Sequence, residues 1–166
     1  MFQQTSQFKL NNYHFTLVLV EPQIPQNAGS IARLCAATNC KLHFVGKLGF
    51  ELSDKYLKRA GLDYWPYVDW EYYPDITAYI SQITPNDLFL STKGERYFID
   101  EDCNYKTGAK LIFGSETAGM PSLIYDQFFP QYRKIPMVGS PEVRSLNLAN
   151  SASIVAYHGL YRLGVL

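Results

Sequence analysis

Short runs of β-forming residues alternate with stretches of helical spacing along almost the whole chain, and this alternation limits the possible folds more than any other feature. The apolar run TLVLV at 16–20 predicts a buried strand. Prolines and a glycine then interrupt the chain, and a helix is expected from Asn27, as its cap, to Thr38. A second strand, KLHFVG, follows at 41–46. This order is typical of α/β folds, so we expect a mainly parallel sheet flanked by helices on both faces.

The same alternation continues to the C-terminus. Further strands are expected near Val68 and at 87–92, 109–114 and 133–137. Further helices are expected at 53–61, 74–83, 122–128 and 146–163. The chain has 166 residues and contains no repeat or linker, so we expect a single domain over 1–166, with residues 1–13 as a polar tail.

Charge and cysteine content narrow the class of protein. Lys plus Arg is 15 and Asp plus Glu is 15, so the strongly basic balance of many nucleic-acid-binding proteins is missing. The three cysteines show no zinc-binding spacing, and reduced thiols in a cytosolic protein are the simplest interpretation. The N-terminus lacks the apolar core of a signal peptide, and no run reaches the ~18 apolar residues of a membrane span. We therefore expect a cytoplasmic protein.

Several common nucleotide and hydrolase motifs are absent. The sequence contains neither G-x-G-x-x-G after the first strand nor the phosphate loop G-x-x-x-x-G-K-[ST]. It also lacks the nucleophile elbow G-x-S-x-G. The three histidines lie far apart, so no metal site is expected, and His43, inside an expected strand, is more simply a structural histidine than a ligand.

Two polar loops follow expected strands, where open α/β sheets bind their ligands. In LIFGSETAGMP, at 111–121, Gly114 would let the backbone approach a ligand closely. In IPMVGSPEVRSLN, at 135–147, main-chain groups could hold a flat heterocycle, and Ser145 or Asn147 could cap the last helix. A tight turn in the first loop and a simple helix cap in the second are the structural alternatives.

A third segment, PQNAGSIARLCAAT at 25–38, places Arg33 on the second turn of the expected helix. A guanidinium fork is suited to contact a phosphate or a ribose. An ordinary surface arginine is the alternative.

Taken in this order, NAGSIARLCAAT, LIFGSETAGMP and IPMVGSPEVRSLNLANSASIVAYH resemble the three motifs of the SPOUT superfamily of RNA methyltransferases. The resemblance covers about residues 15–163 and implies a SPOUT-type fold with a C-terminal trefoil knot. The short chain and KRAGLDYW, at 58–65, are most similar to one branch of the superfamily. That branch methylates the ribose 2′-OH of the wobble nucleotide (position 34, cytidine or modified uridine) in tRNA, notably leucine isoacceptors.

The resemblance also implies S-adenosylmethionine as methyl donor, S-adenosylhomocysteine as product and no metal. The expected partners are tRNA and a second copy of the chain in a homodimer, not DNA or a membrane. By position, the cofactor pocket would include Leu90, Gly114, Ile135, Met137, Ser145 and Leu146. The catalytic residues would be Arg33, Glu116, Ser145 and Asn147. RNA contacts would come from Asn27, Lys55, Lys58, Arg59 and Arg144, with Arg133 and Lys134 as further basic candidates.

Arg33 would be the central catalytic residue implied by the resemblance. A 2′-OH is a poor nucleophile until its proton is lost or strongly polarised. Guanidinium groups stay protonated near neutral pH, and neutralising one costs about 7 kcal/mol. We therefore expect Arg33 to orient the 2′-oxygen and a neighbouring phosphate and to stabilise alkoxide charge, not to act as the base.

Three alternatives stay open from the sequence. The protein could methylate ribosomal RNA or another tRNA position, or it could be a catalytically silent RNA-binding dimer of the same fold. It could also be a generic α/β protein with a small-molecule site. The presence of Arg33, Glu116, Ser145 and Asn147 argues against silence, and a generic protein would not account for three motifs in order.

Overall fold

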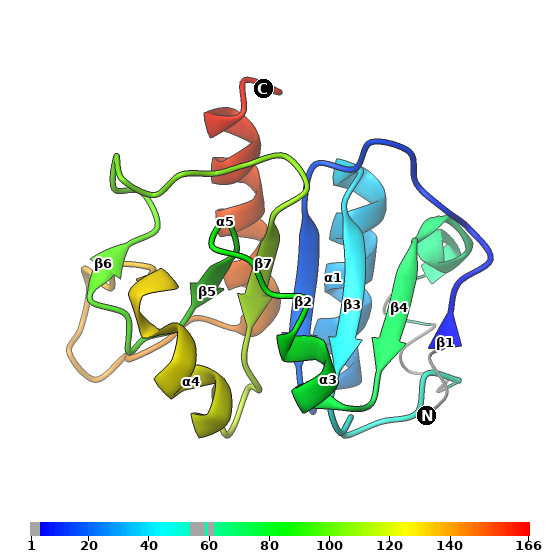
Figure 1. Cartoon of the computed structure of the whole chain (residues 1–166), viewed down its shortest axis with the longest axis horizontal. Helices are drawn as coiled ribbons and strands as arrows, with labels where there is room; N and C mark the ends of the chain where they lie inside the picture. The colour runs from blue at the N-terminus through cyan, green and yellow to red at the C-terminus, as the bar shows by residue number, and fades with distance from the viewer. Residues whose placement is uncertain (1–3, 54–58, 60–61) are drawn as a thin grey trace.

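The computed structural model describes residues 4–53, 59 and 62–166. Within them, eight strands form one sheet in the order β1-β4-β3-β2-β7-β5-β8-β6 (Figure 1). All neighbouring strands are parallel except the edge pair β1 and β4. Their bounds are β1 Gln4–Thr5, β2 Thr16–Val20, β3 Lys41–Val45, β4 Trp70–Tyr73, β5 Leu88–Leu90, β6 Arg96–Tyr97, β7 Lys110–Phe113 and β8 Tyr132–Lys134. The mainly parallel sheet that we predicted is confirmed.

Helices cover both faces of this sheet, as predicted. Helices α1 and α5 pack side by side on one face, and α3 and α4 lie on the other (Figure 1). The bounds are α1 Pro25–Thr38, α3 Ile76–Ile80, α4 Ser122–Phe128 and α5 Leu148–Arg162. Strand β2 serves both cores, because Leu17 and Leu19 pack toward α1 and α5 whereas Val18 and Val20 pack toward α3 and α4. Burial on both faces explains why this strand is a continuous apolar run.

Proline explains two strand boundaries that the sequence pattern placed wrongly. The strand expected near Val68 begins at Trp70, because Pro66 lies in a short 3-10 helix, η1 (Leu62–Tyr67), just before it. Strand β8 ends at Lys134 and not at 137, since Pro136 has no N–H to donate to the sheet. Strand β6 was not predicted, because two residues are too few to show a period. A second 3-10 helix, η2 (Phe129–Gln131), precedes β8.

The helix boundaries follow their caps. Helix α1 begins at Pro25, and its N-cap, Ile24, has no side-chain cap bond, so the prediction of Asn27 as cap is wrong. Asn39 ends α1 in the left-handed conformation, with φ 51° and ψ 45°. Helix α3 is shorter than expected and starts after Asp75, whose side chain accepts the Ala78 N–H. The helix expected at 53–61 falls largely outside the described residues. No helix in the described part of the chain is long and apolar enough to span a membrane.

The polar N-terminal segment is attached to the sheet from residue 4 onward. Strand β1 pairs with β4, and the Ser6 N–H donates to the Trp70 carbonyl at 2.9 Å. The Leu10 N–H donates to Asp69 Oδ2 at 3.0 Å. The segment that we expected to be a tail therefore supplies an edge strand, whose polarity reflects its exposure.

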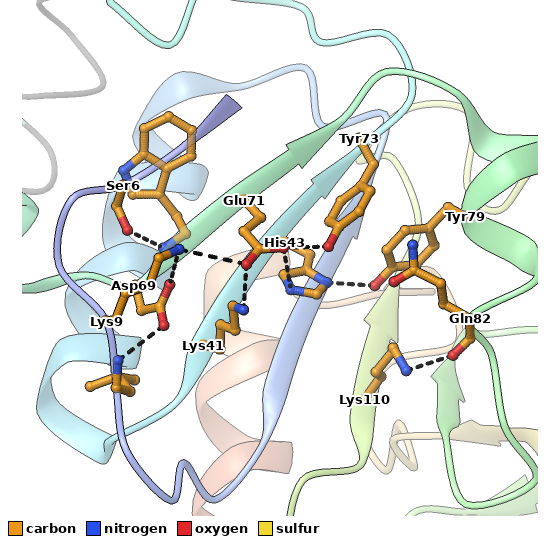
Figure 2. Close-up of polar contacts among 12 residues, drawn as sticks. Ser6, Lys9, Lys41, His43, Asp69, Glu71, Tyr73, Tyr79, Gln82 and Lys110 are labelled. Atoms are coloured by element: carbon orange, nitrogen blue, oxygen red, sulfur yellow. Dashed lines mark hydrogen bonds and ion pairs between the residues drawn. The ribbon is translucent and has the colours of Figure 1, made fainter. Parts of the chain in front are cut away.

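A buried polar cluster lies between strands β3 and β4 and helix α3 (Figure 2). His43 Nδ1 lies 2.8 Å from the Tyr79 hydroxyl, and burial lowers the pKa of His43 to about 3 even though Glu71 favours its charged form. Burial alone would raise the pKa of Glu71, but hydrogen bonds from Lys41 and Tyr73 outweigh it and bring that pKa to about 2. The expectation that His43 is a structural histidine agrees with this setting.

Acid should destabilise the fold through His43. The pKa of His43 is 6.5 in the unfolded chain and about 3 in the folded chain. Between these two pH values, the unfolded chain binds a proton at His43 and the folded chain does not. Its contribution is fully present above pH 6.5 and is lost as the pH falls, by about 2 kcal/mol at pH 5. Urea unfolding at pH 8, 6.5 and 5 measures this loss. His43→Gln should flatten the dependence, and a variant as acid-sensitive as the wild type would contradict the assignment.

Candidate active site

A cavity of about 570 Å³ opens at the carboxyl ends of the parallel strands β5, β7 and β8. The first turn of α1 and the loop before α5 complete its wall. Its lining residues are 24, 27, 90–92, 113–120, 135, 137, 145–148 and 151. The carboxyl edge of the sheet is where open α/β folds bind ligands, so this cavity is the candidate site.

The six residues expected to hold the cofactor all lie around this one cavity. They are Leu90, Gly114, Ile135, Met137, Ser145 and Leu146. The volume falls within the ~300–1,000 Å³ typical of small-molecule sites. The lining offers apolar side chains for a heterocycle and open backbone at Gly114, so the residues present fit S-adenosylmethionine. Their individual contacts with it stay a prediction.

Gly114 is required by a close approach of two backbone segments. Ser115 and Gly119 exchange two backbone hydrogen bonds of 3.0 Å, which fold the loop back over the end of β7. A Cβ on Gly114 would lie 2.5 Å from the carbonyl carbon of Gly119 and 2.6 Å from the nitrogen of Met120. Only glycine leaves room for the loop that forms this wall of the cavity.

Glu116 links that loop to the first turn of α1. Its carboxylate accepts hydrogen bonds from the backbone N–H groups of Gln23, at 2.8 Å, and Ile24, at 3.2 Å. It also accepts one from Asn27 Nδ2 at 3.2 Å. Glu116 therefore satisfies free N–H groups where α1 begins, which explains how this helix forms without a side-chain cap of its own.

Asn27 and Asn147 extend the same network to α5. Asn147 Nδ2 donates to Asn27 Oδ1 at 2.9 Å, and Asn147 Oδ1 accepts the N–H groups of Ala149 and Asn150. Asn147 is thus the N-cap of α5, which confirms that prediction. Asn27, expected to contact RNA, is only 6% exposed and its amide is shared between Glu116 and Asn147. Asn27 therefore connects the Glu116 loop to the start of α5 inside the site.

Arg33 does not line the cavity of its own chain. Its side chain is exposed on α1, and its guanidinium carbon lies 5.0 Å from the centroid of the Tyr64 ring on η1. The structure therefore brings together Glu116, Ser145 and Asn147, but it leaves Arg33 outside that group.

The residues expected to contact RNA are scattered. Arg59 and Arg144 are exposed, whereas Lys55 and Lys58 lie outside the described residues. Arg133 is buried and forms an ion pair with Asp102 at 3.7 Å. Within the described ranges, no group of three or more His, Cys, Asp or Glu side chains could hold a metal ion.

Five polar residues that line the cavity were not predicted from the sequence. They are Ser91, Thr92, Ser115, Thr117 and Ser151. Ser91 and Thr92 are the last two residues of the strand expected at 87–92, so their position at a strand end was a usable signal. Ser151 carries no such signal, because its side chain reaches the cavity only through the start of α5.

Comparison with known proteins places this geometry in a family. The model of the SpoU rRNA Methylase family matches residues 14–157. The tRNA (cytidine(34)-2'-O)-methyltransferase of Saccharophagus degradans is 43% identical over 152 residues, which cover 90% of this chain and 96% of that protein.

Solved structures agree in fold. One described as "Structural insights into the 2-OH methylation of C/U34 on tRNA" is 38% identical, with a TM-score of 0.83, and covers 94% of this chain and 100% of that one. An AdoMet-bound rRNA methyltransferase from Sinorhizobium meliloti, 18% identical, has a TM-score of 0.79 over 95% of this chain and 62% of that one. The last likeness concerns the fold alone.

Proposed function

We propose that this chain, which belongs to the SpoU rRNA methylase family, methylates the ribose 2′-OH of the wobble nucleotide, position 34, in tRNA. The chain is accordingly a methyltransferase, and enzymes of this family take the methyl group from S-adenosylmethionine. The observation that carries the proposal is the cavity in which the second and third sequence motifs meet the start of the first. Relatives at 43% and 38% identity support tRNA position 34 as the target.

The proposal extends to leucine isoacceptors as substrates, to a cytoplasmic location and to chemistry without a metal. It also includes the trefoil knot that the superfamily resemblance implies. The order of strands in the sheet supports a knotted chain. Strand β5 lies between β7 and β8, so segments that come later in the sequence flank an earlier strand on both sides.

The bound cofactor supplies a methyl group on a positively charged sulfur, ready for transfer to an oxygen. Glu116 is poorly suited to take the 2′-OH proton, since three N–H donors already occupy its carboxylate. It instead holds the loop that shapes the cavity. Ser145, at the rim, offers a hydroxyl to orient the ribose. Arg33 supplies the charge that stabilises the developing alkoxide, and the proton leaves to water or to a phosphate oxygen.

A homodimer would bring Arg33 into a site. The exposed residues of α1 include Ser30, Arg33 and Ala37 along one face, where two small side chains permit close contact. On the neighbouring α5, Ile154 and Tyr157 are 40% and 48% exposed and form an apolar stripe with Tyr161. Both faces belong to the same helical layer (Figure 1). Pairing through this layer would bury the stripe and carry Arg33 toward the cavity of the partner subunit.

Tyr157→Glu should separate the dimer. A carboxylate placed in the buried apolar interface has no partner there, so the dimer dissociation constant should rise about 100-fold. Size-exclusion chromatography with light scattering measures this change. Ile99→Glu, at a side chain of the same 48% exposure outside the layer, should leave the dimer intact. A dimer that survives Tyr157→Glu would contradict this interface.

The function is tested by incubating the protein with labelled S-adenosylmethionine and total tRNA and then mapping the labelled nucleotide. Label on the ribose at position 34 of leucine tRNAs is the expected result. Label only in ribosomal RNA, supplied in a parallel reaction, would support the rRNA alternative that the family description suggests. No label in either RNA would support the silent-dimer alternative.

A further inference from the structure

We infer that a surface beside the cavity, formed by Lys93, Tyr97, Tyr125 and Lys134, binds the single-stranded RNA that flanks the target nucleotide. We call these four residues the lysine–tyrosine surface. The inference rests on the proposed function, because it identifies how the same cavity would hold its RNA substrate.

The first half of the surface adjoins the cavity at strand β5. Lys93 follows Ser91 and Thr92, which line the cavity. Its side chain is exposed, and its Nζ atom lies 5.2 Å from the centroid of the Tyr125 ring on α4. This is within the range of a cation–π contact, so the ammonium is held at the edge of the cavity and not left to move freely.

The second half adjoins the cavity at strand β8. Lys134 immediately precedes Ile135, another lining residue. Its Nζ atom lies 5.1 Å from the centroid of the ring of Tyr97, which is 39% exposed on the neighbouring edge strand β6. The same combination of a lysine over a tyrosine therefore recurs at a second strand end of the cavity.

Both halves lie on the face of the sheet that carries α4. The Tyr125 ring packs edge-on against Tyr132, with ring centroids 5.0 Å apart. Tyr132 and Lys134 are two residues apart on β8, so their side chains point to the same face. Helix α4 lies over that face beside β5 (Figure 1). RNA entering the cavity from this side would meet both lysines.

The charges of the two lysines are not neutralised by the described part of the protein. The ion pairs formed there by lysine involve Lys9, Lys41 and Lys110. Lys93 and Lys134 form none with a described residue. Arg133, by contrast, is buried on the opposite face of β8 with Asp102 nearby. The two lysines therefore stay available for an external anion.

A cation held over an aromatic ring suits single-stranded RNA better than a duplex. The ammonium binds a phosphate, and the exposed part of the ring offers a stacking platform for an unpaired base. The wobble nucleotide lies in a single-stranded loop, and its neighbours must lie at the rim when its ribose enters the cavity. The strand ends that carry Lys93 and Lys134 form that rim.

The test measures binding of an anticodon stem–loop RNA from a leucine tRNA over a range of salt concentrations. Lys93→Ala and Lys134→Ala should each weaken binding about fivefold. Each should also lower the slope of log K against log salt by about 0.7, the single-strand value for one phosphate contact. Tyr97→Ala should weaken binding with an unchanged slope, because stacking involves no counterion. Affinity for S-adenosylmethionine should not change in any of the three.

Lys106→Ala is the matched control. This exposed lysine precedes β7, at the amino ends of the parallel strands and thus away from the cavity, and the variant should bind RNA like the wild type. If the wild type methylates position 34 and both lysine variants bind RNA normally, this inference is overturned and the proposed function stands. If the wild type binds no tRNA, both are overturned. An equal loss of RNA affinity in Lys93→Ala and Lys106→Ala would indicate a general effect of positive charge. It would also contradict the proposed role of the lysine–tyrosine surface.

Discussion

Replacing Arg33 by alanine should lower kcat for tRNA methylation about 10³-fold and leave the affinity for S-adenosylmethionine unchanged. The residues expected to hold the cofactor are Leu90, Gly114, Ile135, Met137, Ser145 and Leu146, and this substitution changes none of them. The cost falls on the reacting oxygen, which loses its compensating charge. Arg33→Lys should recover little, since an ammonium lacks the planar fork. Tyr64→Leu removes the ring beside the guanidinium and serves as the control, with near-normal kcat expected.

Mixed dimers would show where Arg33 acts. An Arg33→Ala protomer has an intact cavity, and a Gly114→Ala protomer has an intact arginine. If Arg33 acts across the dimer, co-expression of the two impaired chains restores one working site per hybrid, and activity should rise from the level of either variant to about a quarter of wild-type activity. If it acts within its own chain, every site stays defective and activity does not rise above that of the single variants. Near-normal turnover in Arg33→Ala alone would remove Arg33 from the mechanism.

Much of the fold could be predicted because its strands and helices are locally determined. Strand β2 is buried on both faces, so five apolar or β-branched residues in a row were sufficient to identify it. Helix α4, at 122–128, was predicted with its correct bounds. The edge strands β1 and β6 were missed because each is two residues long and its pairing depends on a distant partner, β4 or β8. Sheet order is likewise set by contacts that no local pattern contains.

The site was predictable in its members more than in their roles. Motif positions brought Gly114, Glu116 and Asn147 into one list, and the structure brings them to one cavity. The role of each residue depends on hydrogen bonds between distant positions. Asn27 bonds to Glu116, about 90 positions away, and to Asn147, 120 positions away. Asn27 illustrates the limit, because a helix start read locally indicates a cap, whereas the real cap of α1 comes from the Glu116 loop. The position of Arg33 relative to the cavity is a three-dimensional fact of the same kind.

Replacing Gly114 by alanine should weaken S-adenosylmethionine binding about 10- to 100-fold and lower methylation in proportion. The new methyl group would meet backbone atoms of Gly119 and Met120, at 2.5 and 2.6 Å, and these cannot swing aside as a flexible side chain could. The loop must shift, and overpacking of this kind costs about 1–3 kcal/mol. Isothermal titration with the cofactor measures the loss, and thermal unfolding verifies that the variant is folded.

Gly139→Ala provides the comparison, because an added Cβ there meets nothing within 4 Å. It should bind cofactor and methylate tRNA as the wild type does, since residue 139 is exposed and is not itself one of the residues that line the cavity. The displaced loop in Gly114→Ala also carries Glu116, so the damage should extend to the first turn of α1 and, through Asn27 and Asn147, to the cap of α5. Faster amide exchange at both helix starts in Gly114→Ala, but not in Gly139→Ala, is therefore expected. Full cofactor affinity in a folded Gly114→Ala protein would mean that the cofactor binds elsewhere.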